Sequence, residues 1–119
     1  MMTPTPPLCR LCTRASTVAP VHAATLWRDP HDDIGLCTCP CGRTWLCLGT
    51  EIFDDLWVFH APLADDEPAA LAAAARGRAS GALRELACAI LRRQMILARG
   101  PNGPHWVDGS AVRLDGPPW

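Results

Sequence analysis

Five cysteines in the first part of the chain have the spacing of metal ligands. Cys9 and Cys12 form a C-x2-C pair, which lets two thiolates converge on one ion. A denser group follows at Cys37, Cys39 and Cys41. Cys37 and Cys39 would point to the same face of an extended strand, so either can be the third ligand beside Cys41. Cys39 is preferred because it lies next to the turn, and Cys37 is kept as its alternative.

The residues beside these cysteines fit a charged thiolate site. Four thiolates around Zn2+ leave a local charge of about −2, and Arg10 and Arg43 stand next to the two groups, where they can offset it. Gly42 follows Cys41 and can adopt a positive φ, which turns nearby amides toward sulfur. We therefore expect Arg10, Gly42 and Arg43 to support the metal ligands.

The two cysteine groups together resemble a zinc ribbon of the treble or ribbon type, over residues 8–48. The resemblance rests on Cys9-Arg10-Leu11-Cys12 and on Cys39-Pro40-Cys41-Gly42. The second turn is one residue shorter than the family's usual C-P-x-C-G, and the 26 residues of segment 13–38 exceed the common spacing of roughly 15–20. The resemblance implies one structural Zn2+ per chain and a place in transcription or translation machinery.

The other cysteines and histidines are interpreted as structural residues. Cys47 and Cys88 stand in apolar surroundings and are typical of small core residues. His60 lies in a predicted strand and is taken as a core or edge residue. Because five thiols compete for four places, the site should be closed rather than catalytic. One alternative to a closed structural site is an enzyme or redox protein that uses Cys37, for example together with His31.

The hydrophobic pattern predicts an α+β fold with a small zinc-clamped antiparallel sheet of about three strands and a helical region after it. A hairpin is expected over 34–48 with its turn at 40–43, a strand over 56–61, and a weaker strand over 21–27. Helix is expected from 65–68 onward and again over 82–99, where Gly100-Pro101 would end it.

The domain organisation follows from the same pattern. Residues 1–7 are a Pro/Thr-rich lead that we expect to be flexible, and residues 8–100 form a single domain. Residues 101–119 are a Gly/Pro-rich tail, with a tight hairpin turn expected at 107–110.

Charge and composition narrow the function classes. The 119 residues carry a net charge of −1 and seven cysteines, and every basic residue is arginine, which is typical of a GC-rich, for example bacterial, genome. This balance argues against binding any polyanion indiscriminately. Neither a secretory leader nor a membrane span is expected. An odd number of clustered thiols favours a cytoplasmic, reducing compartment.

These observations predict a non-enzymatic zinc module that acts as a small regulator or adaptor through contact with a protein partner. Trp106 and Trp119 in the tail are the expected anchors, because tryptophan and arginine dominate interface energies. A nucleic-acid-binding regulator is the alternative. It would use the arginines of the last predicted helix, which are Arg84, Arg92, Arg93 and Arg99.

Overall fold

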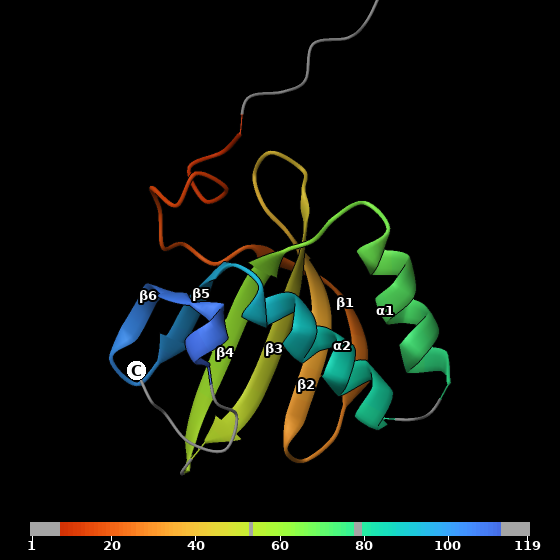
Figure 1. Cartoon of the computed structure of the whole chain (residues 1–119). Helices are drawn as coiled ribbons and strands as arrows, with labels where there is room; N and C mark the ends of the chain where they lie inside the picture. Colours follow the sequence, from red (N-terminus) through yellow and green to blue (C-terminus); the bar gives the residue numbers. More distant parts are fainter. Residues whose placement is uncertain (1–7, 53, 78–79, 113–119) are drawn as a thin grey trace, which may run out of the picture.

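A computed structural model describes residues 8–52, 54–77 and 80–112. The described part is α+β, with a six-stranded antiparallel sheet whose strands lie in sequence order and two helices on one face (Figure 1). The elements are β1 (Val21–Arg28), β2 (Asp32–Thr38), β3 (Thr44–Ile52), β4 (Asp55–Pro62), α1 (Glu67–Arg76), α2 (Ser80–Arg92), β5 (Met95–Gly100), β6 (Gly103–Asp108) and a 3-10 turn (Gly109–Ala111).

The expectation of about three strands is corrected to six. The hairpin over 34–48 and the strand over 56–61 are confirmed as β2–β3 and β4, but helix does not continue to residue 99. α2 ends at Arg92, and β5 begins at Met95. Ile96, Leu97 and Ala98 are all buried, because this strand is covered on both faces. A continuous apolar run of that kind suits a buried strand as well as a helix, so periodicity alone cannot separate the two.

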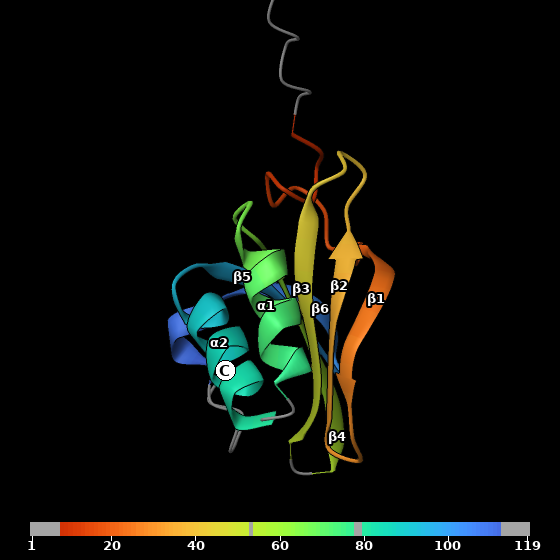
Figure 2. The same cartoon turned by 90° about the vertical axis from the view of Figure 1, so that its right-hand side faces the viewer.

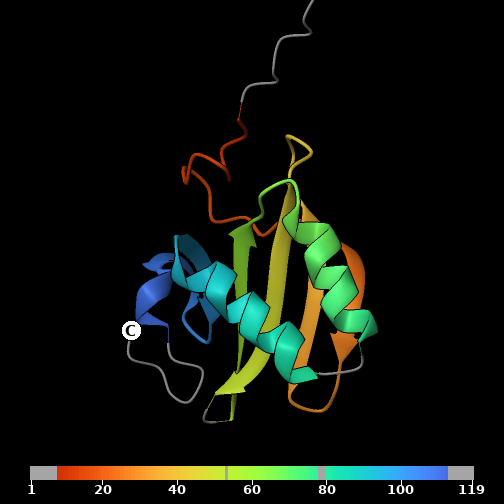
Figure 3. The same ribbon diagram turned by 45° about the vertical axis from the view of Figure 1, so that its right-hand side comes forward.

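The helices bury their apolar stripes against one face of the sheet. Leu71 of α1 and Leu83 and Ile90 of α2 pack into the same core as Leu48 and Phe59 of the sheet. Figures 2 and 3 show both helices on this face only. Asp66 and Pro68 start α1 where the sequence predicts a helix start. The main core is therefore built without any of the predicted metal ligands.

The opposite face carries a second, smaller core. Leu11, Trp45 and Leu97 are buried there together with cysteine side chains, and Trp106 packs against them. The Trp45 and Trp106 rings lie 6.4 Å apart, and Trp106 Nε1 donates to the Ser16 carbonyl at 3.1 Å. These contacts hold segment 8–20, which precedes β1, against this face near one end of the strands (Figures 1 and 2).

The region expected to be a tail is partly strand. Residues 103–108 form β6 and pair with β5 over the full length of both strands. The prediction of a hairpin turn at 107–110 is wrong, because the hairpin between β5 and β6 reverses at 101–102. The Asp108 side chain instead caps the 3-10 turn by accepting from Ser110 N. Residues 1–7 and 113–119 lie outside the described residues, so the flexible lead and the Trp119 anchor stay predictions. Within the described residues, neither helix has the length and apolar character to cross a bilayer.

Candidate metal centre

Four cysteine sulfurs from two distant segments meet at one end of the sheet. The sulfur atoms of Cys9, Cys12, Cys39 and Cys41 all lie within 4.8 Å of one another. Cys12 Sγ is 3.5 Å from Cys39 Sγ and 3.6 Å from Cys41 Sγ, and Cys39 and Cys41 are 3.3 Å apart at sulfur. This cluster is close enough to hold a metal ion such as zinc.

The separations distinguish a shared ion from disulfide bonds. A disulfide needs sulfurs about 2.05 Å apart. Four sulfurs arranged tetrahedrally about 2.3 Å from a zinc ion are separated from each other by about 3.8 Å. The three distances above lie near this second value, and all seven cysteines are free thiols. The donor set therefore fits a four-thiolate metal site.

Two backbone turns present the four sulfurs. In the first, Thr13 N donates to the Cys9 carbonyl at 3.1 Å, which folds the chain back around the C-x2-C pair. In the second, Gly42 N donates to the Cys39 carbonyl at 2.9 Å, and Cys39 N donates to the Arg43 carbonyl at 3.1 Å. Gly42 has φ +88°, which a residue with a Cβ rarely adopts, so glycine permits the tight turn after Cys41.

The thiols of the cluster titrate unequally without an ion. Against the effect of burial, hydrogen bonds from the backbone of Cys12 and Cys41 lower the pKa of Cys9 to about 6. Burial, together with the neighbouring sulfurs of Cys39 and Cys41, raises the pKa of Cys12. Four thiolates this close repel one another, and a divalent cation supplies the charge that lets all four ionise together.

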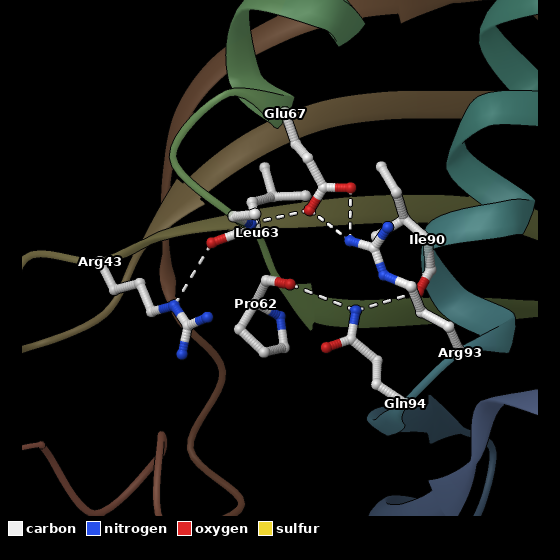
Figure 4. Close-up of polar contacts among 8 residues, drawn as sticks. Arg43, Pro62, Leu63, Glu67, Ile90, Arg93 and Gln94 are labelled. Carbon is white, nitrogen blue, oxygen red and sulfur yellow. Dashed lines mark hydrogen bonds and ion pairs between the residues drawn. The ribbon is translucent and has the colours of Figure 1, made fainter.

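The two arginines beside the cluster have carbonyl partners. Arg10 donates to the Ala15 carbonyl at 3.2 Å, within its own turn. Arg43 donates through Nε to the Leu63 carbonyl at 3.4 Å, which ties the second turn to the chain after β4 (Figure 4). Both arginines are close to the cysteines in the sequence. Their side-chain hydrogen bonds, however, go to backbone carbonyls, so these bonds stabilise the two turns and do not reach the sulfur atoms.

Cys37 belongs to a different cluster. Its sulfur, the sulfur of Cys47 and a ring nitrogen of His60 lie within 4.8 Å of one another on β2, β3 and β4. Cys39 rather than Cys37 therefore stands beside Cys41. Sequence reasoning took Cys47 and His60 as core residues and missed this grouping. The available signal was the register of the β3–β4 hairpin, which puts Cys47 directly opposite His60.

The four arginines expected on one helix are split between elements. Arg84 and Arg92 lie on α2, Arg93 just follows it, and Arg99 lies on β5. Arg84 pairs with Asp32 at 2.8 Å, and Arg93 pairs with Glu67, which also accepts from Ala64 N at 2.7 Å (Figure 4). Two of the four charges are thus used to join helix to sheet and helix to helix.

An apolar groove runs beside the four-cysteine cluster. Its volume is about 810 Å³, and Leu11, Val18, Ala19, Val21 and Pro40 line it together with Cys9 and Cys39. Val18 and Val21 are 75% and 74% exposed, among the largest exposures of big apolar side chains in the described part. Trp106, expected as an exposed anchor, instead packs on Trp45 at the sheet surface.

Comparisons with protein-family models, with curated proteins and with solved structures found no match for this chain. Its function is therefore inferred from the site itself.

Proposed function

We propose that the chain is a non-enzymatic zinc-binding module that acts as an adaptor by seating an apolar segment of a partner protein in the groove beside its metal centre. The observation that carries the proposal is the position of the groove: it is walled by the two cysteine-bearing turns and by the start of β1. Metal binding and partner binding then depend on the same local structure.

The metal of the proposal is one structural Zn2+ held by Cys9, Cys12, Cys39 and Cys41. Four thiolates in tetrahedral array are typical of zinc or of iron–sulfur sites. Four protein ligands close the coordination shell and leave no position for a substrate, which supports a structural role and argues against catalysis at this centre. Seven free thiols also support a reducing, cytoplasmic setting.

The groove has the character of a protein-binding surface. Val18 and Val21 expose apolar area that a folded chain normally buries, and they do so side by side with Pro40 along one hollow. β1 is an edge strand in the described sheet, but its pairing with β2 has two register shifts. Such irregularities discourage strand addition along the whole edge, so the partner contact centres on the groove.

A photo-crosslinking side chain at Val18 tests this proposal in cells. We expect it to capture a specific protein, whereas the same side chain at Leu56, which is 64% exposed on β4 and away from the groove, should not. Val21→Asp should then abolish binding of the purified partner while zinc content and melting temperature are retained. Equal capture from both positions, or binding unaffected by Val21→Asp, would show that the groove is not the docking site.

A further inference from the structure

Three donor side chains converge on the face of the sheet that the helices leave open. Cys37 of β2, Cys47 of β3 and His60 of β4 come from three adjacent strands, and their donor atoms lie within 4.8 Å of one another. Cys47 pairs directly with His60, and Cys37 pairs with Trp45, two residues before Cys47. Cys37 and Cys47 are thus diagonal neighbours on one face, a spacing within reach of side chains.

One ring nitrogen of the buried histidine lacks a hydrogen-bond partner. His60 is only 5% exposed, and its Nδ1 has no hydrogen-bond partner among the described residues. A buried polar atom without a partner costs about 1–3 kcal/mol. Two thiols beside a buried imidazole are a poor choice for simple packing, because any aliphatic residue would fill the space without that cost.

The backbone of β1 comes close to β2 at Gly35, beside Cys47. Gly35 of β2 is the direct pairing partner of Cys47, and His22 of β1 pairs with Cys37. A Cβ at Gly35 would lie 2.6 Å from the Ala24 carbonyl oxygen and 3.7 Å from His22 Nε2. The close approach of β1 excludes larger residues here.

A cavity of about 340 Å³ reaches His60 from outside. Thr17 of the segment before β1 and Leu97 and Arg99 of β5 form part of its wall. This cavity brings solvent up to His60, whereas Cys37 and Cys47 are not part of its wall.

From this geometry we propose that Cys37, Cys47 and His60 form a second metal site, which takes a divalent zinc-type ion and leaves its fourth coordination position to an exogenous ligand. Sulfur and imidazole donors suit such ions. Two thiolates and one divalent ion sum to zero charge, which is the least costly state for a buried site. Three protein ligands and one open position also distinguish this site from the closed four-cysteine centre.

Cobalt titration of the full chain after chelation, under anaerobic conditions, tests the proposal. We expect two Co2+ per wild-type chain, both giving thiolate-to-cobalt absorption. His60→Gln and Cys47→Ser should each bind one. The matched controls His105→Gln, on β6, and Cys88→Ser, on α2, should still bind two. Cys9→Ser should lose the other ion and keep the one that His60→Gln removes, so failure at one centre is distinguishable from failure at the other.

A measurement on the unmodified chain covers the case in which a variant does not fold. With 113Cd2+ in place of cobalt, nuclear magnetic resonance should show two signals per chain, one from four sulfurs and one from mixed sulfur and nitrogen ligands. Saturation of wild type at one Co2+, or a single four-sulfur cadmium signal, would overturn the second site. A Cys37–Cys47 disulfide in protein purified with reductant would overturn it as well.

Discussion

Cys37 and Cys39 are separated by one residue, yet their sulfurs belong to different clusters. Cys37 lies inside β2 and faces Cys47 and His60, whereas Cys39 opens the turn after β2 and meets Cys9, Cys12 and Cys41. The two clusters share one face of the sheet, and Trp45 is buried in the same small core. The end of β2 at Thr38 therefore separates two sets of metal-ligand side chains that are adjacent in the sequence.

Metal removal should release one segment and leave the sheet folded. Ile34, Leu48, Phe59 and the helix residues form the main core without any of the four cysteines, so this core does not depend on the ion. We expect a chelator to lower the melting temperature and to increase hydrogen exchange in residues 8–20 and 39–43, with β3 and β4 still protected. Complete unfolding on chelation would show that the helix-side core cannot stand alone.

The contact between Trp106 and Ser16 should hold that segment independently of the metal. Trp106→Phe keeps an aromatic ring but removes the Nε1 donor of the 3.1 Å hydrogen bond. One neutral hydrogen bond is worth about 1 kcal/mol, so the free energy of unfolding should fall by about that amount. Exchange should rise at residues 15–18. Unchanged exchange there would mean that the bond does not restrain the segment.

The ion pair between Glu67 and Arg93 should make the free energy of unfolding decrease at acid pH. Although burial opposes it, the ion pair with Arg93 and the bond from Ala64 N lower the pKa of Glu67 below its ordinary 4.5. A lowered folded-state pKa means that the stabilisation is complete above about 4.5 and is lost as pH falls through the folded value. Arg93 is 52% exposed at its side chain, so solvent screening keeps the ion-pair gain small.

Glu67→Gln measures this contribution. The variant should lose about 1 kcal/mol at neutral pH, a value within the range of single hydrogen bonds to charged groups after screening. Its denaturation midpoint should change less than that of wild type between about pH 6 and about pH 3, because the variant has no carboxylate to protonate at this position. Glu85→Gln, at an exposed position of α2, is the control and should follow wild type.

How much of this could be predicted from the sequence depends on the range of the interactions involved. The four-cysteine cluster rests on two turns, and turn chemistry at Pro40 and Gly42 is local, so its members could be named in advance. β5 was missed because Ile96, Leu97 and Ala98 continue the helical stripe of α2 equally well. The pairing of Cys47 with His60 required the β3–β4 register. That register could be counted outward from the acidic turn at Asp54, but the strand bounds were not known closely enough.

Binding to generic nucleic acid should be weak. Arg84 is paired with Asp32 and Arg93 with Glu67, so only Arg92 and Arg99 remain of the four predicted contacts without an ion pair among the described residues. We expect no binding tighter than micromolar to random oligonucleotides at physiological salt, measured by fluorescence anisotropy. Tight binding that falls with salt and disappears in Arg92→Ala with Arg99→Ala would promote the nucleic-acid function over protein docking.

The most direct test of the central claim is the metal content of protein purified without added metal, measured by elemental analysis and by native mass spectrometry on the same sample. We predict zinc in wild type, and loss of the four-cysteine ion in Cys12→Ser but not in Cys88→Ser, which lies outside both clusters. The absence of any metal, a coloured iron–sulfur cluster, or unchanged zinc in Cys12→Ser would contradict the claim.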